Sequence, residues 1–78
     1  MNIEEHIKKA VSLFNSGKSS REHARVIIIN HEDDIELTAL LRQRHNTDGW
    51  QEIKCHCRYD GIPIRRSLDV QAGSIEVY

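Results

Sequence analysis

Residues 20–29 read SREHARVIII, and the conformation of this stretch decides between two folds. Ser19 and Glu22 resemble a capping box, which would begin a second helix here. Val26 and the three isoleucines after it are β-branched, which favours a strand, and such an unbroken apolar run is typical of a strand buried on both faces. We therefore predict a central strand over residues 25–30, preceded by at most one helical turn.

Helical patterns mark the segments on either side of this strand. Apolar residues recur at a 3.6-residue period from Ile3 to Phe14, and Asn2 can cap them, so we predict a helix over residues 3–16. A second helix is predicted over residues 32–45, because acidic residues occupy its first turn and basic residues its last, as the helix dipole favours. Its core side is expected to carry Leu37, Leu40 and Leu41, broadened by Ile35 and Ala39.

The C-terminal half of the chain predicts strands. A turn over residues 46–49 precedes Trp50, and from there residues 51–59 alternate between apolar and polar, which is typical of one half-buried antiparallel strand. Asp60-Gly61 favours a two-residue hairpin turn, with register pairs Tyr59 with Ile62, Cys57 with Ile64, and Cys55 with Arg66. A short last strand is predicted over residues 74–78.

The register of this hairpin poses a problem at Arg66. Pairing it with Cys55 would place an arginine on the apolar face of the sheet. We therefore expect either a bulge near Arg65-Arg66 that shifts the register, or an arginine held at the edge of the sheet or at a site.

These elements predict a single α+β domain over residues 1–78, in the order α-β-α-β-β-β. Two helices would pack on one face of a small mixed or antiparallel sheet of four strands. If residues 20–29 are helical instead, the order becomes three helices and a C-terminal β-hairpin, which is the layout of a winged helix.

Composition excludes several classes of protein. Eleven Lys and Arg against twelve Asp and Glu give a formal charge of −1, so the chain lacks the overall basicity of a histone-like protein. No apolar run approaches the roughly eighteen residues that cross a bilayer, and the N-terminus has no signal-peptide pattern. We expect a cytoplasmic protein with no membrane partner, and two cysteines that stay thiols in a reducing compartment.

The triplet Cys55-His56-Cys57 is the most suggestive chemical motif. Two thiolates on one strand face could hold half a zinc site, completed by His45 or His31. The spacing differs from the usual C-x2-C knuckle and no second cysteine pair exists, so we interpret both as core thiols and predict no metal. We find no phosphate loop, dinucleotide fingerprint or nucleophile elbow, and predict no catalytic residue, no cofactor and no enzyme, with a thiol or metal enzyme as a third alternative.

Basic residues form the better candidate for a binding site. The alternation places Lys54, His56, Arg58 and, across the hairpin, Arg65 on one exposed sheet face. The alternative interpretation is a solvated strand face made polar to discourage edge pairing. The candidate partner- or nucleic-acid-binding residues are Arg42, Arg44, Lys54, His56, Arg58, Arg65 and Arg66.

Our leading hypothesis is a small non-enzymatic protein that binds another protein through surface charge and an open sheet edge or helix face. Its size class resembles the short accessory proteins of phages and mobile elements, which include inhibitors of host machinery. The alternative is a small DNA- or RNA-binding protein that uses the basic hairpin face. The sequence leaves open whether the chain is a monomer or a homodimer.

Overall fold

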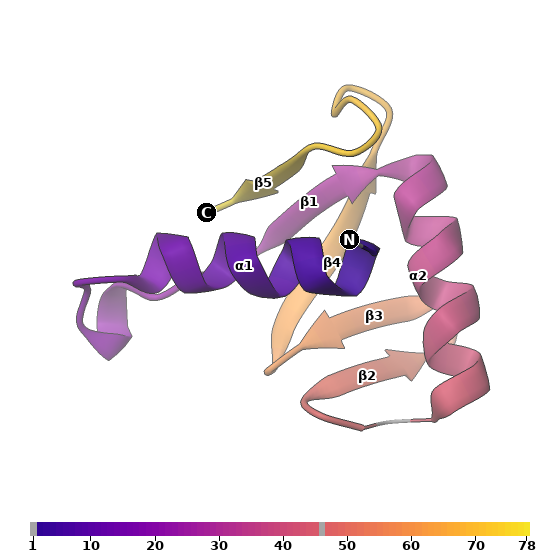
Figure 1. Cartoon of the computed structure of the whole chain (residues 1–78), viewed down its shortest axis with the longest axis horizontal. Coiled ribbons are helices and arrows are strands. Elements are labelled where there is room, and N and C mark those ends of the chain that lie inside the picture. The colour runs from indigo at the N-terminus through magenta and orange to yellow at the C-terminus, as the bar shows by residue number, and fades with distance from the viewer. Residues whose placement is uncertain (1, 46) are drawn as a thin grey trace.

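Two helices cover one face of a five-stranded mixed sheet in the computed structural model, which describes residues 2–45 and 47–78 (Figure 1). The predicted α+β class, with both helices on the same side of the sheet, is confirmed. The sheet has five strands in place of the four we expected, because the segment predicted as one strand over residues 51–59 is two strands. Asn46, in the turn predicted before Trp50, lies outside the described residues.

The stretch that decides the fold is a strand. Helix α1, Ile3–Asn15, is capped by Asn2, whose side-chain Oδ1 accepts a hydrogen bond from the Glu5 amide at 2.9 Å. A single 3-10 turn, Ser20–Glu22, then leads to strand β1, Ile27–Asn30. The winged-helix alternative is therefore wrong, because β-branched residues that pack in mid-sheet outweigh the weak helix-start signal before them.

Helix α2, His31–Arg44, follows β1 without a loop. Asn30, the last residue of the strand, caps the helix by accepting a hydrogen bond from the Glu32 amide at 2.8 Å. Leu37 and Leu41 are buried as expected, whereas Ile35 and Ala39 are exposed and do not broaden the buried stripe. The remaining buried position of the helix is an acid in its first turn, Asp34.

The segment predicted as one strand over residues 51–59 contains a hairpin that the sequence pattern did not indicate. Strands β2, Trp50–Ile53, and β3, His56–Tyr59, pair antiparallel around the turn residues Lys54 and Cys55, whose φ angles are 51° and 68°. Two positive φ angles are typical of a two-residue hairpin turn of type I′. Gly, Asn and Asp are the usual residues in such a turn, so Lys54 and Cys55 did not predict one. The prediction that Cys55 is a core thiol in a strand is wrong: it is an exposed turn residue.

The second hairpin confirms the predicted register. Asp60 and Gly61 both have positive φ, and strand β4, Ile62–Ser67, pairs Tyr59 with Ile62 and Cys57 with Ile64. The pair of Cys55 with Arg66 does not form, because β3 begins only at His56. Beyond Ile64, β4 runs unbroken beside β1 in parallel, so the predicted bulge is wrong. Arg66 does not lie on an edge strand of the sheet either, because β4 is an internal strand between β3 and β1.

Strand β5, Ile75–Val77, completes the sheet antiparallel to β1, in the strand order β2-β3-β4-β1-β5. Since β2 and β4 are both antiparallel to β3, and β4 is parallel to β1, strands β1 and β2 run in the same direction. The segment β1-α2-β2 is thus a crossover, with β3 and β4 inserted between its two strands.

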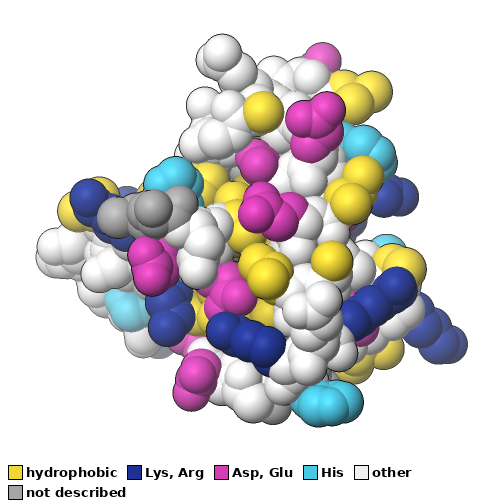
Figure 2. Space-filling model, turned by 45° about the vertical axis from the view of Figure 1, so that its right-hand side comes forward, with side chains coloured by type: hydrophobic (Ala, Val, Ile, Leu, Met, Phe, Trp, Pro, Cys, Tyr) yellow, Lys and Arg dark blue, Asp and Glu magenta, His cyan; other side chains and the backbone are white. Residues whose placement is uncertain are grey.

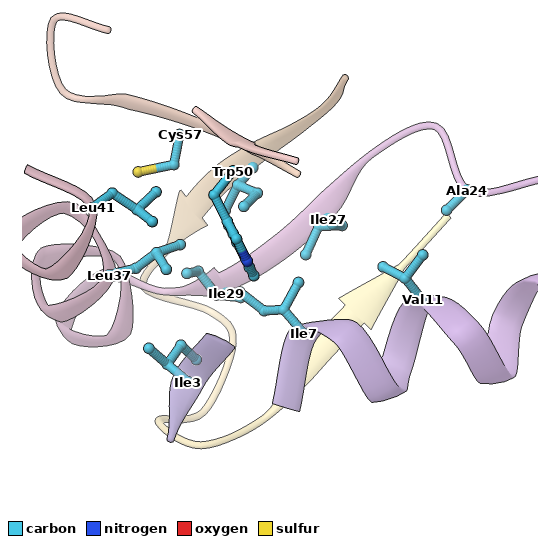
Figure 3. Close-up of a cluster of buried hydrophobic side chains, with 11 residues drawn as sticks. Ile3, Ile7, Val11, Ala24, Ile27, Ile29, Leu37, Leu41, Trp50 and Cys57 are labelled. Carbon is cyan, nitrogen blue, oxygen red and sulfur yellow. The ribbon is translucent and has the colours of Figure 1, made fainter. Parts of the chain in front are cut away.

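The hydrophobic core lies between the helices and this sheet (Figure 3). Trp50 lies at its centre, between the α2 leucines and the side chains of Ile7 and Ile29. Each such buried aliphatic or aromatic side chain contributes roughly 1.5 to 3 kcal/mol relative to an exposed one. The fully buried side chains are Ile7, Ile27, Ile29, Leu37, Leu41, Trp50 and Cys57.

No helix covers the opposite face of the sheet in the described part of the chain (Figure 1). Ile27 and Ile29 are fully buried, whereas Ile28 between them is only partly buried. The expectation that β1 is buried on both faces is therefore wrong, because Ile28 lies on a sheet surface that no helix of the described residues covers.

Candidate functional site

The structure divides the seven predicted binding residues between the two faces of the sheet. His56, Arg58 and Arg65 are exposed and alternate with the buried residues Cys57 and Ile64, so they lie on the side away from the helices. Lys54, in the turn beside them, is also exposed. Arg42, Arg44 and Arg66 belong to the helix side.

We call the sheet surface away from the helices the open face. Gln51 and Ile53 of β2 join the basic residues here, since Gln51 pairs with Arg58 and Ile53 with His56. Farther along the strand order, on the same face, Arg65 of β4 pairs with Ile28 of β1. In full, the open face carries Ile28, Gln51, Ile53, His56, Arg58, Pro63, Arg65 and Glu76.

Apolar and basic groups meet in one hollow of the open face. The side chain of Ile53 is large and apolar, yet 60% of the residue is exposed. The hollow has a volume of about 340 Å³ and is lined by Gln51, Ile53, Lys54, His56 and Arg58. An exposed isoleucine ringed by cations is an arrangement that a partner surface could cover, because it combines apolar area with a charge pattern.

The arginines of the open face lack internal acidic partners. Over residues 2–45 and 47–78 the ion pairs are Arg42 with Glu52 and Arg44 with Glu4, so neither Arg58 nor Arg65 belongs to one. The one acid of the open face, Glu76, accepts a hydrogen bond from the Tyr78 hydroxyl at 2.6 Å.

Arg42 and Arg44 form ion pairs with neighbouring elements, although both side chains are exposed. Arg44 Nη2 lies 2.8 Å from Glu4 Oε2 and joins the last turn of α2 to the first turn of α1. Arg42 Nε lies 3.3 Å from Glu52 Oε2, and its Nη2 donates to Cys55 Sγ at 2.6 Å. Both arginines therefore contact the neighbours of α2, on the other side of the sheet from Arg58 and Arg65.

Glu52 stabilises the unexpected hairpin turn. Its Oε2 accepts a hydrogen bond from the Cys55 amide at 2.8 Å as well as the ion pair from Arg42. The alternation predicted Glu52 on the polar face, but its side chain is only 13% exposed and pairs with Cys57 on the helix side. The charge of this acid is thus used to hold the Lys54-Cys55 turn against α2.

The two cysteines have different surroundings. Cys57 is buried in the core, with its Sγ 3.4 Å from the Thr38 hydroxyl, and burial raises the pKa of its thiol, which the Thr38 hydrogen bond partly offsets. Cys55 is exposed beside Arg42. Within the described residues no group of three or more His, Cys, Asp or Glu side chains is arranged to hold a metal ion.

A second hollow, on the helix side, surrounds Arg66. We call it the notch; its volume is about 370 Å³, and its lining residues are Asp34, Lys54, Cys55, His56, Ile64, Arg65 and Arg66. Asp34 is only 6% exposed, and burial raises the pKa of its carboxyl, against the opposing charges of Arg66, His31 and His56. A carboxyl with a perturbed pKa in a hollow is a common property of functional sites.

Sequence reasoning missed both Asp34 and Glu52. Asp34 was interpreted as one of three acids that favour the helix dipole, and nothing distinguishes it locally from Glu32 or Asp33. Its position three residues before the buried Leu37 places it on the core side of the helix, and this helical spacing was the available signal.

The α2 side of the molecule has no uniform charge. Figure 2, which brings this side forward, shows acidic side chains along its middle and Lys and Arg side chains on both flanks. Within the described residues, neither α-helix combines the length and apolar character needed to cross a membrane. In comparisons with known proteins, no family model matches the chain, and no curated protein or solved structure gives a match.

Proposed function

We propose that this chain is a non-enzymatic binding protein whose open face docks against an acidic surface of another protein. The observation that carries the proposal is a sheet face with no internal cover, on which Arg58 and Arg65 lack acidic partners beside the exposed Ile53. Arginine is enriched at protein interfaces, and an exposed apolar side chain beside it supplies apolar area that becomes buried on binding. Opposite charge on the partner would steer the encounter and fix its orientation.

A nucleic acid is the second candidate, because the same uncompensated cations suit phosphates. Proteins that bind single strands through an open sheet also use aromatic side chains on that sheet to stack on bases. Here the two strand aromatics, Trp50 and Tyr59, lie against each other at 4.6 Å between ring centroids, and Trp50 is in the core. Within the described residues, the strands of the open face carry no exposed aromatic side chain, and the exposed Tyr78 follows β5 at the opposite edge of the sheet from β2, which favours the protein partner.

The size class adds an inhibitory role to this proposal. A chain of 78 residues can block a partner by covering one of its surfaces. Such blocking is the role by which short accessory proteins of phages and mobile elements inhibit host machinery.

The experiment is a comparison of two charge-reversed variants in pulldowns from cell lysate, with and without nuclease. R58E/R65E reverses the open face, and K8E/K9E makes the same change in net charge on exposed positions of α1. We expect wild type and K8E/K9E to retain the same acidic protein after nuclease treatment and R58E/R65E to lose it. Equal retention by both variants would refute the open face as the interface.

The nucleic-acid candidate makes a different forecast for the same experiment. Bound material would be lost on nuclease treatment, and direct titration with an oligonucleotide would show affinity that falls steeply with salt concentration. Retention of a protein after nuclease, with no oligonucleotide binding at low salt, removes this candidate.

A further inference from the structure

The notch forms where the pairing between strands β3 and β4 ends. Strand β3 pairs with β4 only as far as Cys57 with Ile64, since the chain turns at Lys54 and Cys55. Strand β4 continues to Ser67 with β1 on one side and no strand on the other. The side of β4 that faces away from β1 is therefore open from residue 65 onward, and the first turn of α2 lies beside it at Asp34.

Register identifies which main-chain groups face this opening. A two-residue turn makes its flanking residues, Tyr59 and Ile62, a hydrogen-bonded pair, and such pairs recur at every second position along an antiparallel ladder. Pro63 then occupies a position whose missing N–H points away from β3, in keeping with its chemistry, and Ile64 points toward β3. By the same alternation, the N–H and C=O of Arg66 point into the notch.

The side chain of Arg66 faces the same opening. Alternation from the buried Ile64 puts it on the helix side, and it lines the notch as well as two adjoining hollows beside α2 and the loop that follows β4. It takes part in none of the ion pairs of residues 2–45 and 47–78. The main-chain donor and the guanidinium of one residue thus converge on one space.

The remaining charges of the notch suit an anion that also carries a donor group. Lys54, His56 and Arg65 line the same hollow as Arg66 and also belong to no ion pair within the described residues. Guanidinium groups bind phosphoryl oxygens by paired, charge-assisted hydrogen bonds. The buried carboxyl of Asp34 repels an anion when it is ionised, unless a hydroxyl of the ligand donates a hydrogen bond to it.

We propose that the notch binds a small phosphorylated molecule, with its phosphoryl group held by Arg66 and a hydroxyl donating to Asp34. The volume of about 370 Å³ lies at the lower end of the roughly 300 to 1,000 Å³ typical of small-molecule sites. Sugar phosphates and nucleoside monophosphates share this chemistry. The notch shares Lys54, His56 and Arg65 with the rim of the open face, whereas Arg66 and Asp34 belong to the notch and not to the open face, so variants of these two residues separate the two proposals.

Calorimetric titration of the whole chain with four probes tests the assignment. Ribose 5-phosphate carries both groups, methyl phosphate only the phosphoryl group and ribose only hydroxyls, while adenosine 5′-monophosphate distinguishes a nucleotide from a sugar phosphate as the source. We expect saturable binding of ribose 5-phosphate or the nucleotide in the millimolar range, weaker binding of methyl phosphate and none of ribose. Wild-type protein that binds neither phosphorylated hydroxyl compound overturns the proposal.

Variants locate the binding. R66M removes the guanidinium from an exposed position and should weaken ribose 5-phosphate binding by roughly tenfold or more. R21M makes the same charge change in the 3-10 turn, away from α2 (Figure 1), and should bind as wild type does. D34N should reduce the preference for ribose 5-phosphate over methyl phosphate. Equal weakening by R66M and R21M, or an unchanged preference in D34N, contradicts the assigned geometry.

Discussion

Glu52→Ala should destabilise the fold more than any other exposed or half-exposed acid replacement in the described chain, because Glu52 supports the Lys54-Cys55 turn. The change removes a charge-assisted hydrogen bond to the Cys55 amide, of the kind that contributes roughly 1.5 to 3 kcal/mol. It also removes the ion pair with Arg42, which adds little to stability since the Arg42 side chain is 54% exposed and screened by water. The Cys55 amide regains water as a partner, so we expect a net loss of about 2 kcal/mol.

This loss is large for a chain of 78 residues, whose total free energy of unfolding is expected to be about 4 to 12 kcal/mol. The assay is urea denaturation followed by the fluorescence of Trp50, the single tryptophan, which moves from the core to water on unfolding. At a typical urea dependence for a small domain, the midpoint should fall by about 1 to 2 M.

Two matched variants make the result specific. Glu36→Ala removes the same side chain from an exposed position of α2 and should change the free energy of unfolding by less than about 0.5 kcal/mol. Glu52→Gln keeps an oxygen acceptor for the Cys55 amide but loses the charge, so its effect should lie between wild type and Glu52→Ala. If Glu52→Ala and Glu36→Ala unfold at the same urea concentration, the turn does not depend on this contact.

Three further outcomes follow from burial. Burial raises the pKa of the Asp34 carboxyl above its usual 3.8, so the folded chain keeps a proton there that the unfolded chain has lost, and stability falls as pH rises through the interval above 3.8. The variant D34N should therefore be more stable than wild type at pH 7 and equally stable in acid. A difference that stays constant across pH would contradict this. Iodoacetamide should label the exposed Cys55 in the native protein and Cys57 only after unfolding, as peptide mass spectrometry would show; fast labelling of both refutes the burial. Ile29→Ala should cost about 2 to 5 kcal/mol and Ile28→Ala clearly less by urea denaturation, since one face of β1 is open; equal losses would mean that both faces are covered.

The exposed side of the sheet could be predicted for the candidate residues that local alternation governs. His56 and Arg58 face away from the core because they flank Cys57 in a strand, and Arg65 follows the buried Ile64 in the same manner. The contact of Arg44 could not be predicted, because its partner Glu4 lies forty residues earlier in the chain and no local pattern encodes such a contact. The helical spacing from Leu37 was a signal for the burial of Asp34, but the notch that Asp34 lines forms only where α2 lies beside β3 and β4.

The two helices, the central strand and the Asp60-Gly61 hairpin could all be read from local sequence patterns. Each of these depends on short-range physics: apolar periodicity, side-chain caps, β-branching and residues that tolerate positive φ. The turn at Lys54 and Cys55 depends on long-range contacts, because Arg42 and Glu52 stabilise it from two elements that meet only in the folded molecule. That turn ends the pairing of β3 with β4, and so it also creates the notch and places Arg66 beside Asp34.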